Sequence, residues 1–174
     1  YFVAGVGKIE DIFAHRGVNL VDHTGRNETS LTATLEMMKK TKGENGLIFT
    51  NLIDFDQLYG HRRNPEGYAN ALDYVDRFLP QIFTEMAADD LLIITADHGN
   101  DPTHSGSDHT REDVPLLIYS TNTKFKAAVN LGLLQGFTSV ARLCLEHLGL
   151  SKELSKLPDT ARAPSILPSL GLSS

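Results

Sequence analysis

The chain has 174 residues, of which 41% are hydrophobic and 22% charged, and its formal net charge is -6. This length and composition fit one globular domain, while the acidic balance argues against a nucleic-acid partner. No apolar run approaches the roughly 18 residues that a membrane span needs, and the single cysteine, Cys144, excludes an internal disulfide and is typical of a cytoplasmic protein.

Apolar and amphipathic segments alternate along the chain. The first residues carry neither a methionine nor a signal-peptide pattern, so we expect the chain to open inside a strand of a longer protein. In the second predicted helix, Leu31, Leu35 and Met38 recur on one face. Asn64 is the expected N-cap of the third. Strands are predicted at 1–6, 18–22, 47–53, 91–95 and 114–119, and helices at 9–15, 27–41, 65–87 and 137–148.

This alternation predicts an α/β fold, a three-layer sandwich around a mostly parallel sheet. We expect the strands that begin near Leu47 and Leu91 to be parallel neighbours in that sheet, with helices on both faces. Residues 1–150 form the main predicted domain. Residues 151–174 are rich in Ser, Pro and Leu and are predicted to form a tail with one short helix.

Side chains that bind metal ions follow two of the predicted strands, where an open α/β sheet keeps its active site. They supply oxygen and imidazole nitrogen without sulfur, a donor set that suits a two-ion site. Such ions polarise phosphoryl oxygens and lower the pKa of a bound hydroxyl. The predicted ligands are Asp56 and His61 after the third strand, and Asp97, His98 and His109 after the fourth.

The same segments contain competing candidates. Asp54 lies on the same side of its strand end as Asp56, and it either binds the ion or caps the following turn. His104 competes with His109 inside one loop. The remaining histidines are predicted to be surface or helix-face residues: His15, His23 and His147.

Three arginines adjoin the predicted ligands in sequence, and one lysine follows the Gly-Val-Gly turn at 5–7. Because arginine binds phosphate in a bidentate manner, they predict an anionic substrate. For each arginine the alternative is a salt bridge to a neighbouring acidic residue. The segment that carries the lysine lacks the P-loop spacing, and for this lysine the alternative to facing a phosphate is simple exposure. Both alternatives stay open. The basic residues are Lys8, Arg62, Arg63 and Arg111.

Three segments carry longer motifs: Gly-Val-Gly-Lys-Ile at 5–9, Asp-Phe-Asp-Gln-Leu-Tyr-Gly-His-Arg-Arg at 54–63, and Ala-Asp-His-Gly-Asn-Asp-Pro-Thr at 96–103, continuing through Asp-His-Thr-Arg-Glu at 108–112. Together they resemble the phosphopentomutase family of the alkaline phosphatase superfamily. The Asp-His-Gly element marks the wider superfamily. Gly-His-Arg-Arg narrows the resemblance, since the similar cofactor-independent phosphoglycerate mutases tend to carry Gly-His-Thr-Gly there.

The resemblance implies that residues 1–150 are the C-terminal portion of a metal-binding catalytic core. It also implies two Mn²⁺ ions, with Zn²⁺ or Mg²⁺ as substitutes. Asp56, His61 and His109 would hold one ion. Asp97 and His98 would hold the other, together with an aspartate from the family's N-terminal segment. That segment also carries the phosphorylated threonine nucleophile, and this chain shows neither residue.

The activity implied is the interconversion of ribose or 2-deoxyribose 1-phosphate and 5-phosphate, a step of nucleoside catabolism in the cytoplasm. The 174 residues alone are expected to be inactive, because the nucleophile is not among them. Three alternatives stay open: a metal-dependent phosphohydrolase, an enzyme like the cofactor-independent phosphoglycerate mutase, and a metal-binding fragment without turnover.

Overall fold

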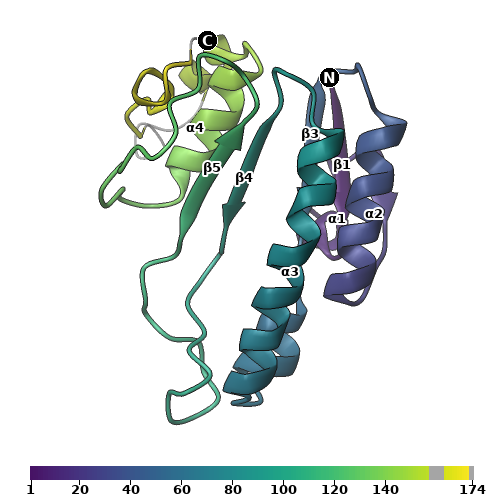
Figure 1. Cartoon of the computed structure of the whole chain (residues 1–174), viewed down its shortest axis with the longest axis vertical. Helices are drawn as coiled ribbons and strands as arrows, with labels where there is room; N and C mark the ends of the chain where they lie inside the picture. Colours follow the sequence, from purple (N-terminus) through teal and green to yellow (C-terminus); the bar gives the residue numbers. More distant parts are fainter. Residues whose placement is uncertain (157–162, 173–174) are drawn as a thin grey trace. The chain divides into compact units, whose positions relative to one another are not determined.

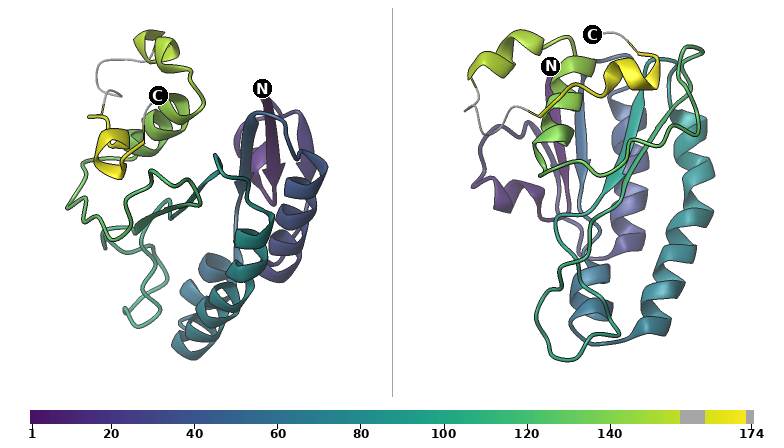
Figure 2. Two further views of the ribbon diagram at one scale, coloured as in Figure 1. Left: turned by 45° about the horizontal axis from the view of Figure 1, so that its top comes forward. Right: turned by 90° about the vertical axis from the view of Figure 1, so that its left-hand side faces the viewer.

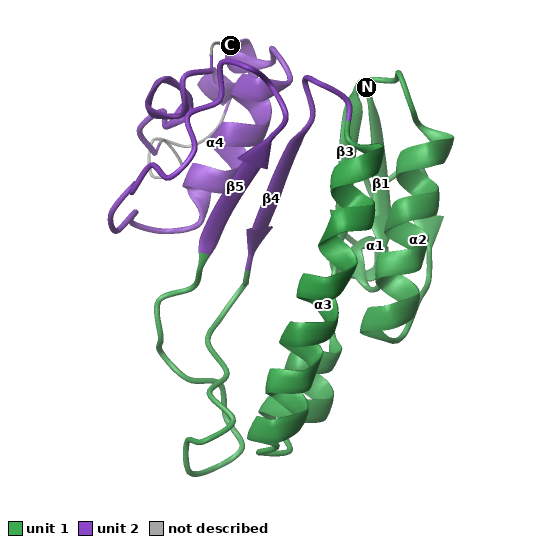
Figure 3. Cartoon of the chain, in the orientation of Figure 1, with its two compact units in different colours: residues 1–86, 96–115 green, residues 87–95, 116–174 purple. Residues whose placement is uncertain are grey.

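A computed structural model describes residues 1–156 and 163–172. The chain divides into two compact units, one of residues 1–86 and 96–115 and the other of residues 87–95 and 116–174 (Figure 3). The loop of residues 96–115 therefore belongs to the first unit, although the strands on either side of it belong to the second. All five predicted metal ligands lie in the first unit.

The first unit is built on a parallel sheet of β1 (Phe2–Val6), β2 (Leu20–Asp22) and β3 (Gly46–Thr50), in the order β2-β1-β3 (Figure 1). Its helices are α1 (Ile9–Ile12), α2 (Asn27–Lys40) and α3 (Pro65–Glu85). Ala4 and Val6 of β1 are completely buried, and α2 packs on β1 and β3 with Leu31 and Met37 buried.

Helix α3 begins where the sequence predicts. The side-chain oxygen of Asn64 accepts a hydrogen bond from the backbone N–H of Gly67 at 2.9 Å, and Pro65 occupies the first turn. An N-cap of this kind satisfies one of the backbone donors that a helix start leaves unpaired. The helix packs along α2, as both views in Figure 2 show.

The second unit is an antiparallel pair with helices. Its strands are β4 (Leu91–Thr95) and β5 (Leu116–Ser120), and its longest helix is α4 (Thr138–His147). Within the described part of the tail, two short 3-10 helices follow, η2 (Ser151–Lys156) and η4 (Leu167–Leu170). Leu143 of α4 is fully buried against Leu167 and Leu170, so the described part of the tail contributes to this core. The predicted division into a domain of residues 1–150 and a tail of residues 151–174 stays a prediction.

The α/β class with a parallel sheet is confirmed, but one detail is wrong. β3 and β4 are not parallel neighbours: β3 pairs with β1, and β4 pairs with β5 in a separate sheet. The antiparallel pairing of β4 with β5 follows from the connection between them, which contains no helix. A parallel return needs a crossover, usually helical, whereas a loop returns the chain directly as an antiparallel partner. Across the described ranges, no helix is both long enough and apolar enough to cross a membrane.

Candidate metal centre

Three side chains from two segments converge on one point. Asp56 lies in the π-helix η1 (Phe55–Gly60), which begins five residues after β3; His61 follows it directly, and His109 comes from the loop of residues 96–115. Oδ1 of Asp56 is 3.3 Å from Nε2 of His61 and 3.2 Å from Nε2 of His109. The two imidazole Nε2 atoms are 3.1 Å apart. The structure therefore brings the first three predicted ligands together.

The spacing of these atoms fits a divalent ion. At metal–ligand bonds of about 2.0–2.3 Å and tetrahedral or octahedral angles, neighbouring ligand atoms are separated by roughly 2.8–3.8 Å. The three separations above fall in this range, and the three ligand atoms all lie within 4.8 Å of one another. One carboxylate and two imidazoles form a donor set that manganese, zinc and related ions accept.

The second nitrogen of His61 fixes the orientation of the ring. Nδ1 of His61 is 2.6 Å from the backbone oxygen of Ser107, and a carbonyl can only accept a hydrogen bond. Nδ1 therefore carries the proton, and in the neutral ring Nε2 keeps the lone pair that an ion needs. Metal-binding histidines use their other nitrogen in this way, which sets the tautomer and the direction of the ring.

Asp97 and His98 lie beside this cluster without joining it. The ring of His98 stacks on that of His109, with centroids 3.7 Å apart and planes 18° from parallel. Nε2 of His98 is 3.7 Å from Oδ1 of Asp97, whose side chain is 81% exposed. Among the described residues, no third acidic or histidine side chain joins this pair in a ligand group.

The competing aspartate has a structural role. Oδ2 of Asp54 accepts hydrogen bonds from the backbone N–H of Asn27 at 3.0 Å and from Nε of Arg26 at 3.3 Å. The backbone N–H of Asp54 donates in return to Oδ1 of Asn27 at 3.0 Å. Asp54 is buried at the first turn of α2, where a carboxylate satisfies free backbone donors and interacts well with the helix dipole. His104 also lies outside the three-ligand group.

The basic residues fall into two groups. Lys8, Arg62 and Arg111 are exposed, and none forms an ion pair with another residue in the part of the chain that the structure describes. Arg63 is different: its guanidinium donates to oxygens of the loop that carries His109. The first three are therefore accessible to an anion, whereas Arg63 is engaged by the protein itself.

Sequence reasoning missed two neighbours of Asp56. Nδ2 of Asn100 donates to Oδ1 of Asp56 at 2.6 Å. Tyr68 of α3 lies near enough that burial, and then the negative charge of Asp56, raise the pKa of its phenol. The only sequence signal for Asn100 is its position directly after the Asp-His-Gly element. Nothing in the sequence pattern marks Tyr68, because it approaches from another helix.

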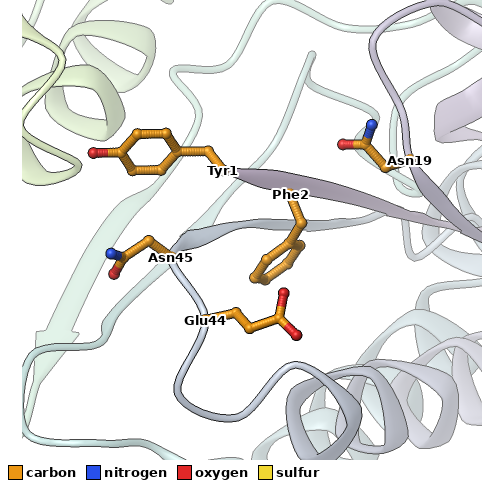
Figure 4. Close-up of a pocket in the computed structure, with 5 residues that line it drawn as sticks. All are labelled: Tyr1, Phe2, Asn19, Glu44 and Asn45. Atoms are coloured by element: carbon orange, nitrogen blue, oxygen red, sulfur yellow. The ribbon is translucent and has the colours of Figure 1, made fainter.

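A separate hollow lies at the amino ends of β1 and β3, in the parallel sheet of the first unit. It is lined by residues at the start of β1 and just before β3, together with Asn19 (Figure 4): Tyr1, Phe2, Asn19, Glu44 and Asn45. The ring of Phe2 lies over Gly46 of the neighbouring strand, where an added Cβ would come within 2.4 Å of it. Open α/β sheets bind ligands at the carboxyl ends of their strands, which is the end that carries Asp56.

Comparison with known proteins also indicates a metal-binding protein. Residues 5–152 match the family described as the Metalloenzyme superfamily. A phosphopentomutase of Caldanaerobacter subterraneus is 53% identical over 84% of this chain and 36% of its own length. One of Acetivibrio thermocellus is 49% identical over 88% and 39%. The chain thus spans little more than a third of the length of these relatives.

A solved structure supports the fold alone. A protein of Pyrococcus horikoshii superposes with a TM-score of 0.50 at 23% identity, over 71% of this chain and 40% of its own. At this identity the likeness concerns the arrangement of the elements and carries no information about the reaction.

Proposed function

Because this chain belongs to the Metalloenzyme superfamily, we propose that its three-ligand cluster binds a divalent ion and that the chain contributes to a phosphopentomutase. The observation that carries the proposal is the convergence of Asp56, His61 and His109 on one point. The similar proteins, at about half identity, are named phosphopentomutases, which supports this assignment. The reaction we propose is the interconversion of ribose or 2-deoxyribose 1-phosphate and 5-phosphate.

The proposed ion is Mn²⁺, with Zn²⁺ or Mg²⁺ as substitutes, because carboxylate and imidazole donors accept all three to different degrees. When bound, such an ion stabilises negative charge on a phosphoryl group. The chain's own residues orient the site. The carbonyl of Ser107 holds the ring of His61, and Asn100 holds the carboxylate of Asp56.

A second ion is proposed at Asp97 and His98. These two side chains are close to each other, and the ring of His98 stacks on the first site through His109. Two protein ligands hold an ion weakly, so the proposal requires a further carboxylate. We propose that this carboxylate and the phosphorylated threonine come from residues of a longer protein, and that the 174 residues alone do not turn over substrate.

The substrate phosphate is proposed to bind the exposed basic residues Lys8, Arg62 and Arg111. Each is accessible, and arginine in particular binds phosphate with two parallel hydrogen bonds. The sequence also predicts Arg63 as a phosphate ligand. In the structure its guanidinium donates hydrogen bonds to loop oxygens, so Arg63 is not among the residues proposed to bind phosphate.

A location in the cytoplasm and a role in nucleoside catabolism complete the proposal. The single cysteine fits the reducing cytoplasm. The net charge of -6 gives no reason to expect a nucleic-acid partner.

The test is a product assay on a full-length protein that contains this chain. Incubation with ribose 1-phosphate, Mn²⁺ and a sugar bisphosphate primer should yield ribose 5-phosphate, at about 1 per second or faster. Release of inorganic phosphate instead would identify a phosphohydrolase and reject the mutase. The 174 residues assayed alone should give neither product. Ribose 5-phosphate from them at an enzymatic rate would show that no further segment is needed.

A further inference from the structure

We infer that Arg63 is a positioning residue, whose guanidinium fastens the loop of residues 100–108 and thereby sets the distance between His61 and His109. Three of its nitrogens donate hydrogen bonds to that loop. Nε donates to the backbone oxygen of Gly106, and Nη2 to that of Asp108 at 2.9 Å. Nη1 donates to the backbone oxygen of Asp101 at 2.7 Å and to Oδ1 of Asn100 at 3.3 Å.

The guanidinium joins the two arms of this loop. Asn100 and Asp101 lie on the arm that leaves the β4 side, and Gly106 and Asp108 lie on the arm that returns. The arms meet at an isolated antiparallel bridge between Gly99 and Thr110, where the N–H of Thr110 donates to the oxygen of Gly99 at 3.0 Å. Beyond this bridge the loop has no strand pairing, so side-chain bonds such as those of Arg63 hold its arms together.

His61 and Arg63 bind three consecutive carbonyls of the returning arm. Arg63 binds those of residues 106 and 108, and Nδ1 of His61 binds the carbonyl of Ser107 between them. His109 is the next residue. The position of His109 along the arm is therefore fixed relative to His61, although the two residues are 48 positions apart in sequence.

The backbone at Arg63 is adapted to this task. Its φ angle is +51°, in the left-handed region that residues other than Gly, Asn and Asp seldom adopt. Its N–H donates to the oxygen of Gly60 at 3.0 Å, which closes the turn between η1 and α3. A residue that keeps an unfavourable φ angle indicates that its neighbours over-determine its position.

Arginine suits this position better than lysine does. Its planar group presents five N–H donors in a fixed fork, and the bonds above use four of them. A lysine ammonium is a single nitrogen, so it cannot reach both arms with the same geometry. Arg63 therefore supports the metal site, and the phosphate-binding role is left to the exposed basic residues.

The experiment compares Arg63→Ala, Arg63→Lys and Arg63→Gly with wild type. Hydrogen exchange is followed at the N–H groups of Thr110 and Asp101, which the loop protects, and Mn²⁺ affinity is measured by titration calorimetry. We expect Arg63→Ala to raise exchange at both amides at least 10-fold and to weaken Mn²⁺ binding by a similar factor. Arg63→Lys should recover only a small part, and Arg63→Gly should match Arg63→Ala although it relieves the positive φ.

The control is Arg77→Ala on α3, an exposed arginine whose pair with Asp73 is local to that helix. It removes the same charge and should change neither quantity. Exchange at β1 amides reports whether a variant has unfolded globally. The inference would be overturned if Arg63→Ala kept wild-type loop exchange and wild-type Mn²⁺ affinity. It would also be overturned if Arg63→Lys restored both quantities to wild-type values. The inference rests on the proposed metal site, yet loop exchange decides it separately: a wild-type chain that fails to bind Mn²⁺ rejects the proposed function only.

Discussion

Asn100 donates a hydrogen bond at 2.6 Å to Oδ1 of Asp56, the same oxygen that His61 and His109 approach at 3.3 and 3.2 Å. The bond fixes one carboxylate oxygen in the direction of the two imidazoles. A carboxylate oxygen has two lone pairs, so it can accept from Asn100 and still face an ion. Asn100 therefore belongs to the site although it is not a ligand, in the way that outer partners commonly orient metal-binding side chains.

Gly60→Ala should weaken metal binding without removing a ligand. A Cβ at Gly60 would lie 2.4 Å from Nδ2 of Asn100, so the amide must move and lose its bond to Asp56. Loss of such an outer partner commonly costs roughly 10–100-fold in metal affinity. Calorimetric titration with Mn²⁺ measures the change. Gly25→Ala is the matched control, because a Cβ there meets nothing within 4 Å; equal affinities for both variants would contradict the role of Asn100.

His109→Ala should abolish Mn²⁺ binding at the first site. The substitution leaves Asp56 and His61, and two ligands compete poorly with water for a divalent ion. Saturation should disappear from the titration over the concentration range in which wild type binds. His23→Ala is the control, since His23 is exposed and lies beside Glu10, away from the three-ligand group. Retention of wild-type affinity in His109→Ala would place the ion elsewhere.

Asn64→Ala should lower the free energy of unfolding by about 1 kcal/mol, because it removes the acceptor that caps α3 at the N–H of Gly67. Urea unfolding followed by circular dichroism measures the change. Asn70→Ala lies in the same helix at an exposed position and removes no cap. It should be neutral or slightly stabilising, since alanine favours helices. A similar loss in both variants would argue against the cap.

Glu146→Ala should destabilise the protein by about 1–3 kcal/mol, because it leaves two half-buried donors, on Arg142 and Ser165, without this acceptor. Oε1 of Glu146 accepts from Nε of Arg142, and Oε2 accepts from the hydroxyl of Ser165, both at 2.6 Å. The residue is 5% exposed and connects α4 to the tail. Glu153→Ala removes an exposed carboxylate in η2 and should change the unfolding free energy by less than about 0.5 kcal/mol. Equal losses of unfolding free energy in Glu146→Ala and Glu153→Ala would contradict a stabilising role of the buried carboxylate.

Cys144 should react slowly with a thiol reagent at pH 8 in the native protein. Burial raises the pKa of its thiol, because the thiolate is poorly solvated in α4. The folded state therefore favours the protonated thiol. This contribution to stability is present below the unfolded pKa of about 8.5 and declines as the pH rises above it. Reaction with an aromatic disulfide, followed by absorbance with and without urea, measures the difference; equal rates in both conditions would contradict it.

The sequence by itself determined much of the first unit. The one-face spacing of apolar residues locates α2, although Met37 is buried more fully than the predicted Met38. Asn64 and Pro65 locate the start of α3 because capping is a local interaction. Residue type and position after a strand also select Asp56, His61 and His109, since an open sheet gathers such side chains at its carboxyl end.

Tertiary structure decided what depends on contacts between distant segments. The sequence left Asp54 and Asp56 as alternatives, and only the hydrogen bonds to Asn27 and Arg26 show that Asp54 caps α2. The alternation of elements in the sequence also predicted β4 as a neighbour of β3, whereas backbone hydrogen bonds pair β4 with β5.

The roles of Arg63 and Asn100 were equally invisible in the sequence. A guanidinium can bind a phosphate or a set of carbonyls with the same donors, and the choice depends on where the chain places those acceptors. In this protein the acceptors are oxygens of the loop of residues 100–108, more than 35 positions from Arg63 along the chain. Local patterns specify which chemical groups are present, and long-range packing decides which partners they meet.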